Sequence, residues 1–226
     1  MKTKMMIVAA LLGCTFYSNA VTIDLRHEYV DISEQNRNRI LVSHRFASGV
    51  GLSIEGMLKS GGNNTDKPFS DMVDNGTEYS VSYLNKLTPA VNVQPGFEFA
   101  TTSTTSVYKP YLRAQYSFSN GLYVSGRYRY EYVRNTTQGK DDEHVNRGDI
   151  WLGYKYDNLT FELNGVYKKS DQIKFDNRKE DYEYNGRIAW KYDANWTPYV
   201  ELGNVAVAAN SSERQTRYRL GMQYTF

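Results

Sequence analysis

Arginines occur in this chain at a spacing that places them on one side of an extended strand. Arg127 and Arg129 are two residues apart, as are Arg217 and Arg219. Side chains at positions i and i+2 of a strand point to the same face. A guanidinium stays charged at any relevant pH, and its planar set of donors fits a carboxylate bidentately. These pairs therefore predict the binding of carboxylates, provided that strands carry them.

Strand-like segments of about ten residues run through the whole chain, with alternating apolar and polar side chains. We predict twelve strands, at residues 22–31, 39–47, 50–60, 77–87, 91–100, 108–118, 122–132, 147–156, 159–169, 181–192, 197–206 and 214–226. The connections are alternately short and long, and the longest span 61–76, 133–146 and 170–180. This pattern is typical of an outer-membrane β-barrel with tight periplasmic turns and longer outer loops. After Phe16 no apolar run reaches the roughly 18 residues of a transmembrane helix.

The placement of aromatic residues separates a membrane barrel from a soluble β-sandwich, which would also show alternation. Aromatic residues on the apolar face are predicted at the two ends of the strands, and smaller or aliphatic residues in the middle. The predicted periplasmic ends carry Phe46, Phe118, Tyr156, Tyr192, Trp196 and Phe226, and the outer ends carry Tyr29, Tyr79, Tyr108, Tyr132, Tyr167 and Tyr182. Two aromatic belts around an aliphatic band match a bilayer and its interfaces. We therefore predict a transmembrane, antiparallel, up-and-down barrel, which gives outer-membrane lipid as a partner.

Residues 1–20 have the features of a secretory signal peptide. Lys2 and Lys4 precede an apolar run, and Ser18-Asn19-Ala20 suits cleavage after Ala20. A lipoprotein signal at Cys14 is the alternative, and it would leave a very short apolar region. Cleavage after Ala20 leaves one domain, 21–226, without cysteine and therefore without disulfides. It also removes the formal net charge of +2, so bulk charge predicts no nucleic-acid partner.

The polar face of the predicted strands would line the lumen of the barrel. The arginines with this parity are Arg26, Arg45, Arg113, Arg127, Arg129, Arg187, Arg217 and Arg219. Seven of these eight form two groups, one on the first, second and twelfth strands and one on the sixth and seventh. The two groups would face each other across the pore, and a carboxylate could pass from one guanidinium to the next. The alternative is that these arginines pair with lumen acids such as Glu98, Glu131 and Glu201 and hold the barrel rigid.

Several motifs of the chain are similar to those of one porin family. They are Asp24-Leu25-Arg26-His27-Glu28, Ser43-His44-Arg45-Phe46-Ala47, Lys67-Pro68-Phe69, Asn75-Gly76-Thr77-Glu78, Gln94-Pro95-Gly96-Phe97, Pro110-Tyr111-Leu112-Arg113, Arg127-Tyr128-Arg129-Tyr130, Asn195-Trp196-Thr197-Pro198-Tyr199-Val200-Glu201 and Glu213-Arg214-Gln215-Thr216-Arg217-Tyr218-Arg219. The chain thereby resembles the oligogalacturonate-specific porin (KdgM) family, small monomeric porins for acidic oligosaccharides. The stretch 136–179 resembles the family least.

The resemblance implies a monomeric twelve-stranded barrel that takes up oligogalacturonates from pectin breakdown. It also implies that the lumen arginines in matching motifs conduct anionic sugar chains, whereas Arg187 rests on strand parity alone. The chain ends in alternating residues down to Phe226, which resembles the signal that the outer-membrane assembly machinery reads. Alternatives within the transport class are a porin for another acidic sugar, such as sialic acid, and a weakly selective anion porin.

Two other classes of function are less consistent with the sequence. Enzymes that use a nucleophile need a positioned base, but His27 and His44 have lipid-facing parity, and His144 falls in a predicted loop. The chain also has no metal-ligand spacing and no phosphate-binding loop, so we predict no catalysis, no metal and no cofactor. A structural or adhesive barrel with a blocked lumen is the remaining alternative, and in it the loop at 61–76 would fold inwards or bind outside the barrel.

Overall fold

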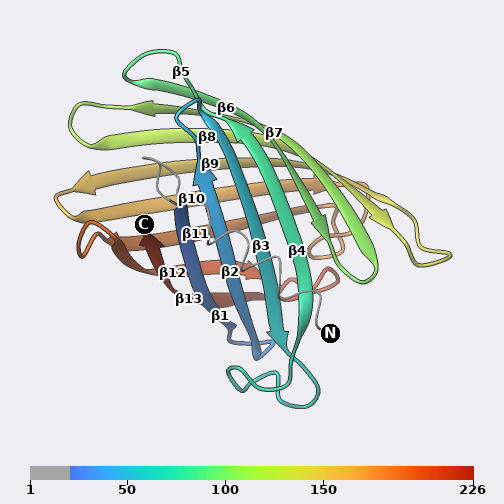
Figure 1. The fold of residues 1–226 in the computed structure, drawn as a ribbon. Coiled ribbons are helices and arrows are strands. Elements are labelled where there is room, and N and C mark those ends of the chain that lie inside the picture. The colour runs from blue at the N-terminus through green and yellow to red at the C-terminus, as the bar shows by residue number, and fades with distance from the viewer. Residues whose placement is uncertain (1–20) are drawn as a thin grey trace, which may run out of the picture.

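The computed structural model describes residues 21–226 as a closed antiparallel β-barrel (Figure 1). The predicted signal peptide and its cleavage site lie outside the described residues. The strands are β1 (Val21–Val30), β2 (Gln35–Arg45), β3 (Val50–Ser60), β4 (Met72–Tyr83), β5 (Asn85–Lys86), β6 (Val91–Thr101), β7 (Thr105–Ser117), β8 (Leu122–Asn135), β9 (Glu143–Tyr156), β10 (Leu159–Ser170), β11 (Glu180–Trp190), β12 (Trp196–Ala206) and β13 (Arg214–Thr225). Because β4 and β5 both pair with β6 and follow each other along its edge, they count as one of twelve barrel strands.

Pairing between the first and last strands closes the ring. Residues from Thr22 to Val30 of β1 pair with residues from Thr225 to Arg217 of β13, and every other strand pairs with its sequence neighbours. The predicted fold of twelve antiparallel strands is therefore confirmed. No helix among residues 21–226 is long and apolar enough to cross a membrane.

The alternation in the sequence corresponds to the inner and outer faces of the wall. On β1, Asp24 is 4% exposed and points inwards, whereas the neighbouring Leu25 is 49% exposed on the outer face. Leu163 and Leu220 are likewise 63% exposed in the middle of their strands. A water-soluble sheet would bury such side chains, but a barrel turns them towards lipid.

Tight turns join the strands at one end of the barrel, and most of the longer loops lie at the other end (Figure 1). Gly121, in the turn between β7 and β8, has a φ of +88°. A Cβ on Gly121 would also lie closer than 3.0 Å to the Lys155 carbonyl oxygen. The turn therefore requires glycine both for its backbone conformation and for lack of space. With twelve strands, both ends of the described chain fall at the end with the tight turns, the predicted periplasmic side.

Three strands begin four or five residues earlier than the sequence predicts. β2 begins at Gln35 rather than 39, β4 at Met72 rather than 77, and β9 at Glu143 rather than 147. The prediction was wrong at these outer ends because polar residues on the outer face interrupt the alternation. The structure satisfies two of them locally: Asn36 donates to the Thr65 carbonyl oxygen, and Asn146 accepts a hydrogen bond from the Tyr128 hydroxyl.

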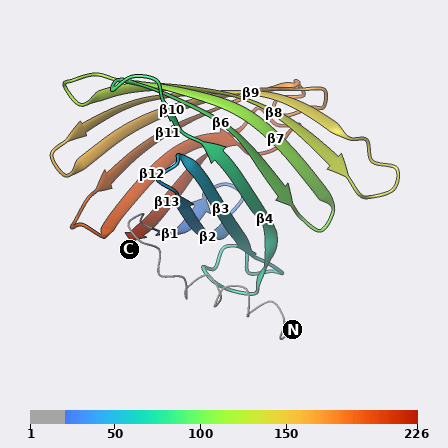
Figure 2. The same cartoon turned by 45° about the horizontal axis from the view of Figure 1, so that its top comes forward.

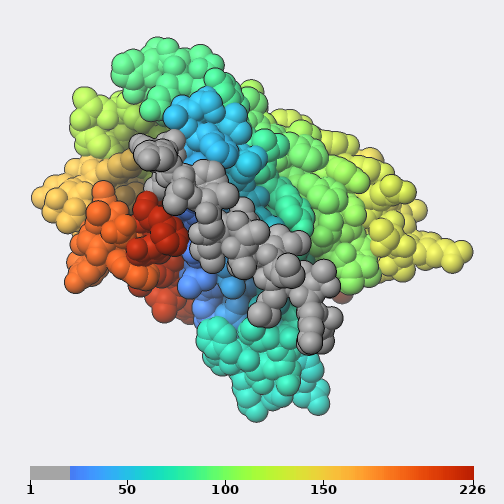
Figure 3. Space-filling model, in the orientation of Figure 1, coloured from blue at the N-terminus to red at the C-terminus, as the bar shows by residue number. Residues whose placement is uncertain are grey.

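The loop at residues 61–71 lies outside the barrel rather than in the lumen. The ring of Phe69 is 5.1 Å from that of His27, which is on the outer face of β1. Thr65 covers Asn36, which is 1% exposed although it is on the outer face of β2. Figure 3 shows this loop as a lobe beyond the strands at one end. This loop therefore does not enter the lumen.

Candidate functional site: the lumen arginines

The strand order places the predicted arginines on opposite sides of the ring. β13, β1 and β2 are neighbours, and β7 and β8 are half-way around from them. Figure 2 shows β6 to β11 arching over β1 to β4. We call β7, β8 and β9 the β8 wall, with Arg113, Arg127 and Arg129. We call β11, β12, β13, β1 and β2 the β1 wall, with Arg26, Arg45, Arg187, Arg217 and Arg219.

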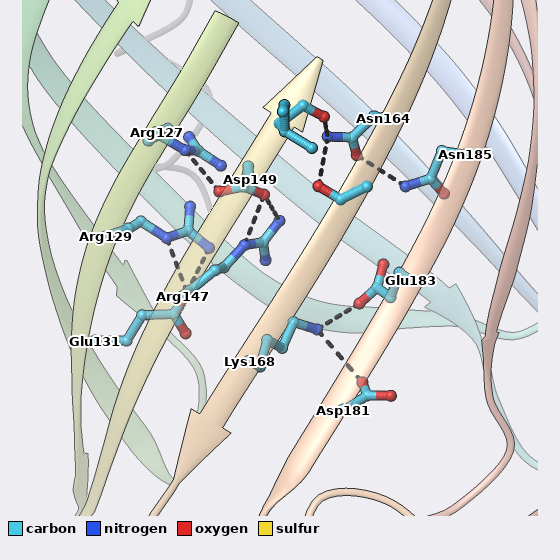
Figure 4. A network of polar contacts seen from close by, with 12 residues as sticks. Arg127, Arg129, Glu131, Arg147, Asp149, Asn164, Lys168, Asp181, Glu183 and Asn185 are labelled. Carbon is cyan, nitrogen blue, oxygen red and sulfur yellow. Dashed lines mark hydrogen bonds and ion pairs between the residues drawn. The ribbon is translucent and has the colours of Figure 1, made fainter. Parts of the chain in front are cut away.

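Carboxylates hold two of the three predicted arginines of the β8 wall. Arg127 donates from Nε to Asp149 at 3.0 Å, and one of its terminal nitrogens is 3.3 Å from Glu98. Arg129 contacts Glu98 at 2.6 Å and Glu131 at 2.5 Å. These guanidiniums thus share acids in one network, part of which Figure 4 shows.

The β1 wall contains a similar network around Arg219. This side chain donates to Glu28 at 2.6 Å and to Glu201 at 2.5 Å. Arg217 contacts Glu183 at 3.4 Å and donates to the Asn185 side chain at 2.7 Å. The structural alternative for these arginines, pairing with lumen acids, therefore describes their contacts well.

Four of the predicted arginines have no such partner. Among residues 21–226, no carboxylate oxygen lies within 4.0 Å of the side-chain nitrogens of Arg26, Arg45, Arg113 or Arg187. Arg45 donates to the Gly49 carbonyl oxygen at 2.8 Å, which fixes it at the periplasmic end. Arg113 donates from Nε to Ser125 at 2.7 Å. The Nε atoms of Arg26 and Arg187 are buried without a hydrogen-bond partner.

Aromatic rings support three of the lumen guanidiniums. Arg113 lies 4.5 Å from the ring centre of Trp151, and Arg127 lies 5.4 Å from it. On the β1 wall, Arg187 lies 4.2 Å from the ring centre of Tyr199. A cation over an aromatic face gains attraction without being neutralised, so Arg113 and Arg187, which contact no carboxylate, keep their charge available to a ligand.

A polar cavity of about 250 Å³ opens in the lumen between β9 and β13. Arg187, Arg217 and Arg219 line it together with Glu162 and Glu201. Guanidiniums can donate to the carboxylate of a uronic acid, and the glutamates can accept from its hydroxyl groups. The cavity therefore combines the two kinds of group that an acidic sugar needs.

Sequence reasoning missed several charged lumen residues. Arg39 contacts Asp24 at 2.9 Å, and Arg147 contacts Asp149 at 2.7 Å. Lys109 contacts Glu78 at 2.6 Å, and Arg37 contacts Glu28 at 3.0 Å. Arg39, Lys109 and Arg147 lie inside the predicted strands with lumen parity, so parity alone would have found them. Arg37 becomes a strand residue only when β2 begins at Gln35.

Histidine positions bear on the enzyme alternative. His27 lies on the outer face, where its Nδ1 and the Asn38 side chain are 2.9 Å apart. The prediction that His144 lies in a loop is wrong, because it belongs to β9, where its ring stacks 5.1 Å from that of Tyr132. Within residues 21–226, no group of three or more potential metal ligands gathers.

The sequence model of one family, described as "Oligogalacturonate-specific porin protein (KdgM)", matches residues 14–226. The chain belongs to this family. It is 48% identical over 210 residues to the "Uncharacterized protein YiiY" of Salmonella typhimurium, which covers 92% of each chain. It is 37% identical over 238 residues, the full length of both chains, to the "Oligogalacturonate-specific porin KdgM" of Dickeya dadantii.

A more distant relative and a solved structure complete the comparison. The "N-acetylneuraminic acid outer membrane channel protein NanC" of Escherichia coli K12 is 23% identical over 243 residues, covering 99% of both chains. The structure of a "KdgM porin in complex with disordered oligogalacturonate" is 34% identical, with a TM-score of 0.69, and covers 91% of this chain and 99% of the other. The predicted resemblance to the family is thus confirmed.

Proposed function

We propose that this chain is an outer-membrane porin for the passive uptake of anionic oligosaccharides, with oligogalacturonates as the substrate. The observation that carries the proposal is the pair of guanidiniums on the β1 wall that contact no carboxylate, Arg26 and Arg187, beside a network of paired arginines and a polar cavity. Uncompensated positive charge in a low-dielectric tube attracts anions. Family membership and the relative named for oligogalacturonate support a polyuronate as the anion.

The arginines that are paired with acids are suited to the passage of an anionic sugar rather than to its tight binding. Glu28 and Glu201 already occupy part of the donor set of Arg219, so a passing carboxylate must compete for it. Weak contacts at several sites allow an ion to leave as well as to enter a channel. The mixed charge thereby suits a sugar chain that exchanges from one arginine to the next.

The proposal includes the surroundings of the barrel. The apolar band contacts outer-membrane lipid, the chain works as a monomer without cofactor or catalysis, and Phe226 presents the assembly signal. The second candidate is a porin for another acidic sugar, which the relative named for N-acetylneuraminic acid supports. A blocked, adhesive barrel is less consistent with the loop at 61–71, which packs on the outer face.

Single-channel recording in planar bilayers tests this function. The refolded protein should form discrete, anion-preferring channels, which trigalacturonate blocks transiently and more strongly at low salt, because salt screens exposed charges. Sialic acid and neutral maltotriose, at the same concentration, serve as comparisons. A silent bilayer would refute the pore, and a cation-selective channel would refute the proposed uptake of anions. Equal block by trigalacturonate and maltotriose would refute the substrate, and stronger block by sialic acid would favour the second candidate.

A further inference from the structure

Glycines on the two faces of the barrel wall have very different surroundings. Five glycines on regular strands face the lumen. A Cβ added to any of them would lie closer than 3.0 Å to a side-chain atom of a neighbouring strand. They are Gly51, Gly96, Gly153, Gly203 and Gly221. On the lipid face, a Cβ added to Gly56, Gly126 or Gly148 would have no neighbour within 4 Å.

The side chain that covers each lumen glycine comes from the residue directly opposite in the strand register. Three of these residues are tyrosines, one is an arginine and one is an asparagine. The pairs are Gly96 with Tyr111, Gly153 with Tyr123, Gly221 with Tyr199, Gly51 with Arg45 and Gly203 with Asn185. None of these glycines has the positive φ that would require glycine for backbone reasons. What they share is a side chain lying across the bare backbone.

Tyr199 shows what such a contact achieves. Its ring lies across Gly221 and is buried, and its hydroxyl donates to Asp24 at 2.8 Å. Asp24 in turn holds Arg39, and the ring lies under Arg187. Because Arg187 has no carboxylate partner, the ring is the group that positions its guanidinium. The ring can take this place only while residue 221 has no side chain.

We infer that the lumen glycines are positioning residues, because they let tyrosine and arginine side chains lie flat against the barrel wall. This arrangement keeps the lumen wide and determines the positions of the guanidiniums. Part of this inference rests on the proposed function, because it makes the glycines determinants of selectivity. A methyl group at any of the five positions must push a ring, a guanidinium or, at Gly203, the Asn185 amide away from the wall. The lumen would then narrow, and the neighbouring charge would move.

The test compares alanine substitutions on the two faces. Gly221→Ala should lower the single-channel conductance in KCl, reduce chloride preference and weaken trigalacturonate block roughly two- to fivefold, the factor expected for a partly exposed cation–π contact. The matched control, Gly126→Ala, adds the same methyl group to open space on the lipid face and should behave as the unsubstituted protein. Equal behaviour of the two variants would overturn the inference.

A double-mutant cycle separates positioning from general damage. Tyr199→Leu should alone weaken chloride preference, and adding Gly221→Ala to it should have little further effect, because the displaced ring is gone. Additive effects would contradict the proposed contact. If Gly221→Ala does not fold, Gly203→Ala provides the test, since an added Cβ there would meet the ends of the Asn185 and Arg217 side chains rather than a ring. Conductance and chloride preference in KCl remain informative even if trigalacturonate blocks no variant, a result that would refute the substrate alone.

Discussion

The two arginine walls contain the same kinds of group in different balance. On the β8 wall, Arg127 and Arg129 share Glu98, and Asp149 joins Arg127 to Arg147. Even Arg113, which has no acid partner, is tied by its Nε to Ser125. Each of these four arginines therefore donates to at least one group on the wall itself, and Arg127 and Arg129 also contact Glu98 on the neighbouring β6.

The β1 wall leaves more of its donors uncommitted. Arg219 is held by two acids, but Arg26 and Arg187 each keep a buried Nε without a partner. Arg187 also borders the 250 Å³ cavity. From this comparison we propose that the β8 wall forms a rigid, mixed-charge surface and that the β1 wall provides the stronger carboxylate site. Three predictions test this difference.

The largest expected effect is on stability and separates paired from unpaired arginines. Arg219→Ala leaves Glu28 with only Arg37 as a cation within contact distance and removes the closest cation from Glu201. Stranding part-buried carboxylates in this way should lower the free energy of unfolding by about 1–3 kcal/mol. Arg187→Ala, which strands no acid and loses only its contact with the Tyr199 ring, should lower it by less than about 1 kcal/mol. Urea unfolding followed by heat-modifiable gel mobility measures both, and equal losses would remove the distinction between the two kinds of arginine.

The next effect is on ligand binding and compares the two walls directly. Arg187→Ala should weaken trigalacturonate block about tenfold, the factor for losing one charge-assisted hydrogen bond. Arg113→Ala should weaken it only about threefold, because this guanidinium is already bound to Ser125. Arg187→Lys should retain most of the ion current but should weaken trigalacturonate block, since lysine lacks the planar set of donors that binds a carboxylate bidentately. Residence times of trigalacturonate in single channels provide the measurement. A larger loss from Arg113→Ala would reverse the assignment of the stronger site.

Strand parity was enough to predict the barrel and the direction of the side chains. The inward position of Arg127 and the outward position of Tyr128 follow from alternation alone, which the hydrophobic effect imposes along a strand with lipid on one side. The same reasoning placed β13 beside β1, because a closed barrel has no edges. The opposite positions of the two arginine groups follow from that closure.

Pairing and packing could not be predicted from the sequence in the same way. Arg219 and Arg187 have the same parity, but only the register shows that one lies between Glu28 and Glu201 while the other lies over Tyr199. The outer end of β2 was missed because Asn36 and Asn38 interrupt the apolar face. Their partners are Thr65, in a distant loop, and His27, on the neighbouring strand, and local alternation identifies neither contact.

The smallest expected effect is at the outer end of the β8 wall, in the loop at residues 136–142. The Tyr132 hydroxyl donates to Asp142 and lowers the pKa of that carboxyl below its ordinary value, and the Asn135 amide donates to the same group. A lowered pKa means that the folded loop favours the ionised form. Its contribution to stability is therefore complete above the ordinary aspartate pKa of about 3.9 and is lost as the pH falls through the lower folded value.

Acid should accordingly loosen this loop before it affects the strands of the β8 wall. Amide hydrogen exchange of residues 135–143, corrected for the intrinsic pH dependence, should show constant protection from pH 7 to about pH 5 and a gradual loss below about pH 4. Asp142→Asn keeps an acceptor for the Asn135 amide but cannot ionise, so its protection should be lower at pH 7 and should not change over this range. Tyr132→Phe removes the main cause of the shift and should move the loss of protection to higher pH. Identical pH profiles for all three proteins would show that the carboxylate does not hold the loop, and the outer end of the β8 wall would then owe its order to strand pairing alone.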